Sequence, residues 1–315
     1  MKSFGDLERK CEATFANGGP FWHAYTSGKD TPLLFPDERA LSYAMNIIAQ
    51  AAFTHPDIVI VAFEVMNNHF HFVLSAEKER ISSFWRFIQR RLKRSFPEAA
   101  CTTLSIKAID NLNSLRNNIA YTHRNGYVAN PSHTPFNYPW GTGRYYFMDC
   151  PACFPITELR YDDLRRLLRC RTPHLPENSQ MVSLDMEQSV STLPCCYVAP
   201  SSYCAIKFGM AMFRNAHHYF SAVSKNVEAY CGVAIEIDDD EFLTDSELFT
   251  QLSAILRESY QGASLKTVSK SQKFDIARTL RHSFRSSNAQ IRRLLGLTQY
   301  EIEAGWTFWV MKTLQ

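Results

Sequence analysis

Residues Ile58–Leu74 read IVIVAFEVMNNHFHFVL, an apolar run that contains two adjacent asparagines. The part up to Phe63 is β-branched and aromatic, which indicates a buried strand. Asn67 and Asn68 can adopt the left-handed conformations that a tight turn needs. A second strand is therefore expected from His69 to Leu74, and the stretch as a whole predicts a β-hairpin.

Two histidines stand at alternate positions of the second strand. Successive side chains of a strand point to opposite faces, so His69 and His71 should point one way while Phe70 and Phe72 point the other. Two imidazoles about 7 Å apart along one face can hold one divalent ion between them. The simpler alternative is a pair of half-buried histidines bonded to neighbouring polar groups. The H-x-H pattern alone leaves both open.

Further strands and helices are expected around this hairpin. Strand patterns occur at residues 21–26 and 103–108, and amphipathic helix patterns at residues 36–53, 77–96 and 110–124, the last with Asp110 as its cap. The resulting order is strand, helix, strand, strand, helix, strand, helix. It predicts an α+β fold with a small antiparallel sheet and helices on one face.

Differences in composition and residue pattern divide the chain into three parts. Residues 1–150 carry the α+β pattern, residues 151–202 are rich in proline, serine and polar residues, and residues 203–315 are helical in pattern. We therefore expect a first domain, an irregular connection and an all-α C-terminal region. A chain of 315 residues is long enough for two domains.

Composition is typical of a soluble globular protein, with 45% apolar and 21% charged residues. No stretch approaches the roughly 18 uncharged apolar residues of a membrane span, and the N-terminus lacks a signal-peptide core, so a cytoplasmic location is expected. The nine cysteines are odd in number, which favours reduced thiols. Cys150 and Cys153 have the spacing of half a zinc site, but no second pair matches it, so free thiols are the stronger expectation.

Basic residues gather in two segments of a chain whose formal net charge is only +3. Residues 86–94 read RFIQRRLKR, with five bases and no acid, and residues 264–293 hold eight bases and one acid. Either run could be a solvated helix face. Two such faces in a chain that is nearly neutral also favour a polyanionic partner.

Four blocks of the sequence together resemble a known family. Val65–Leu74 (VMNNHFHFVL) is similar to an MPNHVH-like stretch, and Ala120–Asn130 (AYTHRNGYVAN) is similar to a YIHxNPVRAG stretch that follows it. Phe136–Phe147 (FNYPWGTGRYYF) resembles a YPWSSYRYY segment, and Trp22–Gly28 with Leu34–Glu38 resembles the usual start. Proteins with these blocks in this order are the single-tyrosine HUH transposases, especially the REP-associated tyrosine transposases.

The resemblance covers roughly residues 20–150 and implies a role for each matching position. It implies an HUH nuclease fold, His69 and His71 as ligands of a divalent ion (Mg²⁺ or Mn²⁺), and Tyr121 as the nucleophile. Asn125 stands where the family has a polar third ligand, and positions i and i+4 share one helix face. The family's proline is replaced here by Asn67, and its Pro-Val by Gly126-Tyr127, yet neither change removes a chemical group.

Metal-assisted attack by a tyrosine is the chemistry that the resemblance implies. A divalent ion would polarise the scissile phosphate and stabilise the leaving 3′ oxygen. Attack by Tyr121 would leave a 5′-phosphotyrosine link and a free 3′-OH, so that rejoining needs no ATP. An ordinary core tyrosine is the alternative for this position.

Single-stranded DNA beside a hairpin is the substrate that the resemblance implies. Tyr138 and Trp140 could stack on unpaired bases, or could simply pack the loop that contains them. Backbone phosphates are the expected partners of the first basic segment, through Arg86, Arg90, Arg91, Lys93 and Arg94. A homodimer is compatible with the sequence.

The C-terminal segment 273–305 has the pattern of a helix-turn-helix. Its first helix should end near Arg285, and Gly296 stands where the turn needs a glycine. On that interpretation Arg281, Arg285 and Arg292 contact phosphates of flanking duplex DNA, and Gln299 approaches base edges. An ordinary three-helix cap is the alternative.

Two other functions remain compatible with the sequence. One is a non-catalytic, sequence-specific nucleic-acid-binding regulator on the same fold, which would need neither the histidine pair nor Tyr121. The other is a phosphotyrosine-forming nickase for replication or mobilisation, which shares the H-x-H chemistry. The short spacing between the histidines and the tyrosine favours the transposase.

Overall fold

A computed structural model describes residues 3–28, 31–129, 133–148, 157–159, 196–239, 243–298 and 300–302. The chain divides into two compact units, Met1–Asn226 and Val227–Gln315. No helix in the described ranges is long and apolar enough to cross a membrane. Cys150 and Cys153 lie outside the described residues, while Cys11, Cys101 and Cys204 are free thiols.

A four-stranded antiparallel sheet forms the centre of the first unit. Its strands are β1 (Phe21–Thr26), β2 (Val59–Val65), β3 (Phe70–Ser75) and β4 (Leu104–Ile109), in the spatial order β2-β3-β1-β4. β3 pairs with β2 on one side and with β1 on the other, and β4 forms the far edge. The predicted hairpin and all four predicted strands are therefore present, and the α+β class is confirmed.

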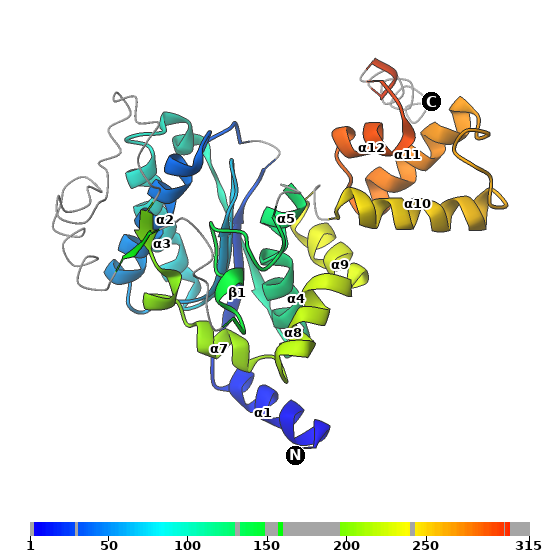
Figure 1. Ribbon diagram of the computed structural model, residues 1–315. Coiled ribbons are helices and arrows are strands. Elements are labelled where there is room, and N and C mark those ends of the chain that lie inside the picture. Colours follow the sequence, from blue (N-terminus) through cyan, green and yellow to red (C-terminus); the bar gives the residue numbers. More distant parts are fainter. Residues whose placement is uncertain are drawn as a thin grey trace. The chain divides into compact units, whose positions relative to one another are not determined.

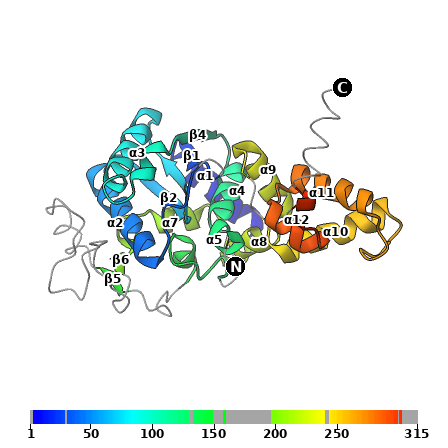
Figure 2. The same ribbon diagram turned by 90° about the horizontal axis from the view of Figure 1, so that it is seen from above.

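The first helical layer consists of α2 (Glu38–Thr54) and α3 (Lys78–Leu92), which cover one face of the sheet (Figures 1 and 2). Asp37 caps α2 by accepting the amides of Arg39 and Ala40 at 3.0 and 2.9 Å. The apolar stripe of α3 meets alternate residues of β3, since Phe84 packs against Phe72 and Trp85 packs against Phe70. The short helix η1 (Pro97–Cys101) follows this layer and leads into β4.

A second helical layer covers the other face of the sheet, where the sequence predicted helices on one face only. It contains α4 (Leu112–Thr122), α5 (Asn125–Ala129), α7 (Ile206–Ala211) and α8 (Ala216–Lys225), with α1 (Phe4–Ala16) packed against α4 and α7 (Figure 1). The difference has a physical reason. Both faces of β3 are buried, so the sheet needs apolar cover on both sides.

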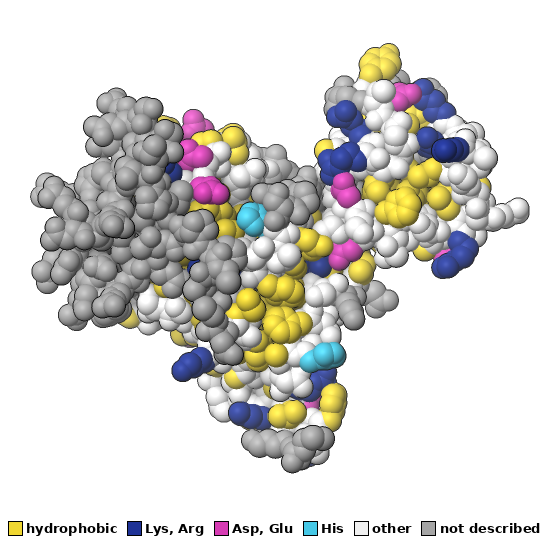
Figure 3. Space-filling view, viewed as in Figure 1, with side chains coloured by type: hydrophobic (Ala, Val, Ile, Leu, Met, Phe, Trp, Pro, Cys, Tyr) yellow, Lys and Arg dark blue, Asp and Glu magenta, His cyan; other side chains and the backbone are white. Residues whose placement is uncertain are grey.

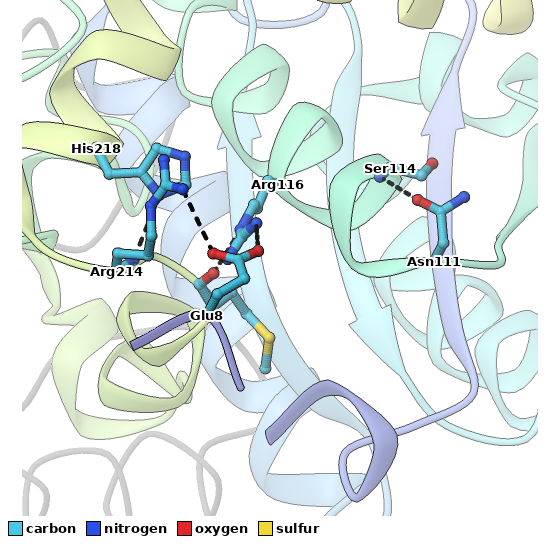
Figure 4. A network of polar contacts seen from close by, with 7 residues as sticks. Glu8, Asn111, Ser114, Arg116, Arg214 and His218 are labelled. Atoms are coloured by element: carbon cyan, nitrogen blue, oxygen red, sulfur yellow. Dashed lines mark hydrogen bonds and ion pairs between the residues drawn. The ribbon is translucent and has the colours of Figure 1, made fainter. Parts of the chain in front are cut away.

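Ion pairs and hydrogen bonds fix α4 within this layer (Figure 4). The buried Arg116 donates to both carboxylate oxygens of Glu8 on α1, at 2.7 and 3.2 Å, and to the carbonyl of Met212 at 2.6 Å. Arg214 approaches the same carboxylate at 3.6 Å. The helix begins one residue later than predicted, because Asn111 rather than Asp110 is the cap and accepts the Ser114 amide at 2.8 Å.

The remaining elements of the first unit are short. They are η2 (Gly143–Tyr145), η3 (Pro200–Ser202) and a parallel pair of strands, β5 (Thr157–Leu159) and β6 (Cys196–Val198). The helices α7 and α8, which fall in the range predicted as a separate helical region, belong to this unit. The predicted domain limits at residues 150 and 203 stay predictions.

The second unit is helical, as the sequence predicts for the C-terminal region. Its helices are α9 (Val227–Ile237), α10 (Asp245–Ser259), α11 (Lys270–Phe284) and α12 (Asn288–Leu295). Capping boxes at Thr244, Ser269 and Ser287 begin the last three. Gly296 ends α12 with a φ of 65°, the left-handed conformation that favours glycine.

Candidate active site

The two histidines of the hairpin lie together on the α4 face of the sheet. Their ring centroids are 5.0 Å apart, and one ring nitrogen of each lies within 4.8 Å of the other's. His71 is 1% exposed, whereas His69, at the tip of the hairpin, is half-buried. The alternation of side chains along β3 places Phe70 and Phe72 on the opposite face, against α3. This is the arrangement that the strand period predicts.

Tyr121 reaches the same place from α4. Its ring lies edge-on to His71, with 5.7 Å between the centroids, and 6.2 Å from the ring of His23. The side chain is 1% exposed. Three residues from separate sequence blocks therefore meet, because α4 crosses the face of β3 on which the histidines stand.

His23 is the member of the cluster that the sequence did not identify. It lies on β1, is 1% exposed, and its Nε2 is 3.2 Å from His71 Nδ1, while its Nδ1 is 2.6 Å from Asn118 Oδ1. A lone histidine in a strand gives little signal by itself. Only the sheet order, with β1 beside β3, brings His23 to the site.

Tyr25 is a second tyrosine close to His71. The two residues are directly paired across β1 and β3, and their rings are stacked with centroids 6.3 Å apart. Tyr25 is half-buried. The histidine pair therefore has a tyrosine on the neighbouring strand as well as Tyr121 on α4, and an experiment must distinguish between them.

Glu64 adds a buried carboxyl beside these side chains. It is paired with His71 across β2 and β3, is fully buried, and accepts the Gly126 amide at 2.8 Å through Oε2. Its other oxygen, Oε1, has no hydrogen-bond partner among the described residues. Burial raises the pKa of the Glu64 carboxyl well above its ordinary value, although the Gly126 hydrogen bond acts in the opposite direction.

The chemistry of the histidine pair suits a divalent ion. Burial, and then the neighbouring rings of His69 and His23, lower the pKa of His71 well below its ordinary value. His71 is therefore neutral at pH 7, and the neutral imidazole is the form that binds metals. Two ring nitrogens within 4.8 Å of one another fit Mn²⁺ better than Mg²⁺, which prefers oxygen ligands.

Asn125 lies at the start of α5, just beyond a break in the helix that carries Tyr121. Its side chain is 3% exposed and donates through Nδ2 to the Tyr121 carbonyl at 3.1 Å, which leaves the amide oxygen as the group that could meet a cation. Its role as third ligand stays a prediction. At the next position a Cβ would lie 2.2 Å from the ring of Tyr138, so Gly126 leaves room for that ring.

Tyr138 and Trp140 pack in the interior of the first unit. They are 6% and 3% exposed, Tyr138 donates its hydroxyl to the Val65 carbonyl at 2.8 Å, and Trp140 contacts Tyr197. Base stacking needs exposed rings, so both side chains would have to move before they could stack on a base. Their stacking on DNA stays a prediction.

The basic segment of α3 lies on the layer opposite the histidines. Arg86, Arg90, Lys93 and Arg94 are exposed, whereas Arg91 is half-buried over the ring of Phe87. A surface hollow of 410 Å³ is lined by Ser83, Arg86, Gln89, Arg90, Lys93 and Ala100. This segment can attract phosphates, but it does not face Tyr121.

In the second unit, the arginines predicted to contact phosphates make contacts within the unit. Arg281 donates to the Ser286 carbonyl at 3.0 Å, Arg285 ends α11 in a left-handed conformation 3.2 Å from Asp238, and Arg292 is half-buried. Figure 3 shows further Lys and Arg side chains over the surface of this unit. Gln299 lies outside the described residues. The helix-turn-helix and its DNA contacts stay predictions.

Comparison with known proteins finds a similar solved structure but no matching family. No protein-family profile and no curated protein matches the chain. The chain is similar to a solved structure described as a REP-associated tyrosine transposase bound to a REP hairpin, with 20% identity over 41% of this chain and 79% of that one. The TM-score is 0.33, so the likeness carries no functional argument, and functional reasoning must stand on the site residues themselves.

Proposed function

We propose that this protein is a metal-dependent, single-tyrosine DNA transposase or recombinase that cleaves and rejoins single-stranded DNA near hairpins. The observation that carries the proposal is the meeting of Tyr121, His71 and His69, with 5.7 Å between the first two ring centroids and 5.0 Å between the last two. A buried tyrosine beside a histidine pair provides a nucleophile and ligands for a divalent ion in one place.

The reaction exchanges one phosphodiester for another. The Tyr121 hydroxyl oxygen forms a bond to phosphorus, the bond from phosphorus to the 3′ oxygen breaks, and that oxygen gains a proton equivalent to the one that the tyrosine loses. Bound between His69 and His71, with Asn125 as the proposed third ligand, Mn²⁺ or Mg²⁺ would polarise the phosphate. The 5′-phosphotyrosine link conserves the energy of the broken ester, so the reverse attack by a 3′-OH rejoins DNA without ATP.

DNA is the proposed partner, and the exposed basic side chains of α3 are proposed to contact its phosphate backbone. They lie on the opposite helical layer from Tyr121, so a strand that touches both must pass around the sheet. Tyr121 and His71 are each 1% exposed, and the proposal therefore requires that the groups covering them move before a strand enters.

That burial favours one alternative, the non-catalytic nucleic-acid-binding regulator. A regulator would bind DNA through exposed basic side chains and would use Tyr121 and the histidines only for packing. The two functions differ in one property, the formation of a covalent protein–DNA complex.

Covalent capture tests the proposal. Single-stranded hairpin DNA from the flanks of the gene, labelled at its 3′ end so that the label stays with the protein-linked fragment, is incubated with the protein and Mn²⁺ and resolved on a denaturing gel. We expect a shifted band that is lost with EDTA and in Tyr121→Phe. The matched control is Tyr25→Phe, which alters the other tyrosine beside His71 and should keep the band. A band that survives Tyr121→Phe, or no band when DNA is bound, contradicts the proposal.

A further inference from the structure

Two asparagine side chains surround the histidine pair at the positions that decide where the ring protons lie. A neutral imidazole carries one proton, and the hydrogen bond made by one ring nitrogen determines which nitrogen is left with a lone pair. Hydrogen positions follow from the partners of each group. Because a backbone carbonyl only accepts, it gives each chain of hydrogen bonds a fixed starting point.

The first chain begins at the carbonyl of Ser114 on α4. Asn118 Nδ2 is 2.8 Å from that oxygen and must donate to it, which orients the amide. The amide oxygen of Asn118 then faces His23 Nδ1 at 2.6 Å. An amide oxygen only accepts, so the proton of His23 lies on Nδ1.

The chain continues from His23 to His71. With its proton on Nδ1, the neutral His23 has a lone pair on Nε2, and that atom lies 3.2 Å from His71 Nδ1. His71 Nδ1 therefore donates, and the lone pair of His71 is left on Nε2. This direction holds for the neutral His23 ring, which is 1% exposed.

The second chain reaches His69 through its neighbour in the turn. Asn68 Nδ2 donates to the carbonyls of Gly28 and Thr31, at 2.8 and 3.0 Å, so Asn68 Oδ1 faces His69 Nδ1 at 2.6 Å and accepts its proton. A Cβ on residue 28 would lie 2.8 Å from that nitrogen, so Gly28 leaves the ring room beside the turn. In the neutral ring, the lone pair of His69 is again on Nε2.

We propose that Asn118, His23 and Asn68 are positioning residues that hold both site histidines in the Nδ1–H tautomer, which places the lone pair of each neutral ring on Nε2. The two chains come from different elements, α4 with β1 and the hairpin turn, yet they select the same tautomer. The assignment concerns the metal-free protein and stands on its own geometry. Its consequence for metal binding and cleavage rests on the proposed function.

The consequence for affinity follows from preorganisation. A histidine whose proton must move from Nε2, or whose ring must turn, binds a cation less tightly than one already fixed, and loss of such an orienting partner typically weakens metal binding by about 10- to 100-fold. Asn118→Leu removes the link between the Ser114 carbonyl and His23 while nearly keeping the volume of the side chain. Asn113→Leu, on the exposed side of the same helix, is the matched control.

Histidine-ring NMR on the metal-free protein tests the assignment directly. Long-range ¹H–¹⁵N correlation spectra distinguish the Nδ1–H from the Nε2–H tautomer, and His69→Gln and His71→Gln assign the two rings. We expect the Nδ1–H pattern for both in the unmodified protein. Asn118→Leu should give His71 a mixture of tautomers and leave His69 unchanged, Asn68→Leu should do the reverse, and Asn113→Leu should change neither ring.

Mn²⁺ titration by calorimetry is the second readout, with an expected affinity loss of about 10- to 100-fold for Asn118→Leu and none for Asn113→Leu. An Nε2–H pattern at His71 in the unmodified protein overturns the inference, even if every variant fails to fold. Nδ1–H tautomers without any covalent DNA product would contradict the proposed function and leave this inference standing. A covalent product together with Nε2–H tautomers would support the proposed function and overturn this inference.

Discussion

Tyr121 on α4 and His71 on β3 pack edge to face, with ring centroids 5.7 Å apart and an interplanar angle of 80°. The contact joins the second helical layer to the middle of the sheet and is buried on both sides. It exists because His71 occupies the position of β3 that points away from α2 and α3, and because α4 is held across that face by Arg116.

Removing the metal should abolish strand cleavage and leave DNA binding in place. EDTA, or replacement of the half-buried His69 by alanine, takes away the metal ion that would polarise the phosphate. Neither change removes the exposed basic side chains of α3. We expect cleavage to fall by at least about 100-fold, with hairpin affinity on a native gel nearly unchanged. His217→Ala, at an exposed histidine, serves as control and should keep full activity. Equal cleavage with and without EDTA would contradict a metal-dependent reaction.

Glu64→Gln should stabilise the protein more strongly as pH rises. An unfolded glutamate ionises near its ordinary pKa of 4.5, and the folded pKa is raised, so the folded state binds this proton more tightly. The stabilisation that protonated Glu64 provides is therefore present at low pH and lost as pH rises through the folded pKa. Glutamine keeps an acceptor for the Gly126 amide and never ionises.

Urea unfolding at two pH values checks this expectation. We expect Glu64→Gln to match the unmodified protein near pH 5 and to exceed it by roughly 1–3 kcal/mol near pH 8. The exposed Glu98→Gln is the control and should show no pH-dependent gain. A gain at pH 5 that disappears at pH 8 would reverse the sign and contradict the raised pKa.

The pair of Arg116 and Glu8 should contribute strongly to stability because Arg116 is only 8% exposed. Arg116→Met removes the donor of the Met212 carbonyl and leaves the Glu8 carboxylate with only the longer contact to Arg214, and we expect a loss of about 3 kcal/mol in the free energy of unfolding. Arg9→Met breaks the exposed pair with Asp6 on the same α1 helix and should cost less than about 1 kcal/mol. Similar losses in the two variants would show that the buried pair does not anchor α4.

The bases of α3 should bind DNA phosphates without taking part in cleavage. Arg86→Ala with Arg90→Ala removes two bases from the 410 Å³ hollow. We expect weaker binding and a salt dependence whose logarithmic slope falls by about 0.7–0.9 for each lost phosphate contact. Fluorescence titrations at several salt concentrations measure this slope, and Arg9→Ala with Lys10→Ala on α1 is the control. An unchanged slope would exclude α3 as a DNA-binding face.

The hairpin strands were predictable because they are runs rich in β-branched and aromatic residues. The helices of the first layer were predictable as elements, because α3 has an apolar stripe of Ile81, Phe84, Trp85, Ile88 and Leu92. The second layer was not, since a helix pattern does not tell which face of a sheet the helix covers. The helix α1 was not predicted either, although Ser3 and Asp6 form a capping box that marks its start.

The site was predictable where a local pattern carries chemistry and not where the fold assembles it. His69, His71 and Tyr121 stand in recognisable blocks. His23, Asn118 and Glu64 reach the site only through strand order, register and helix placement, none of which the sequence displays. Tyr138 is the opposite case, because its local sequence suggests an exposed ring and the structure buries it. An aromatic residue in a segment rich in glycine and proline resembles an exposed loop, but the absence of a side chain at Gly126 lets its ring enter the interior.

Mapping the residue that carries DNA tests the central claim most directly. The covalent complex is digested with nuclease and trypsin, and tandem mass spectrometry locates the remaining nucleotide. Cleavage after Arg116 and Arg124 releases the peptide Asn117–Arg124, NNIAYTHR, in which Tyr121 is the single tyrosine. The account predicts a nucleotide joined through phosphate to Tyr121. An adduct on Tyr25 or on any other residue, or hairpin binding without any adduct, would contradict it.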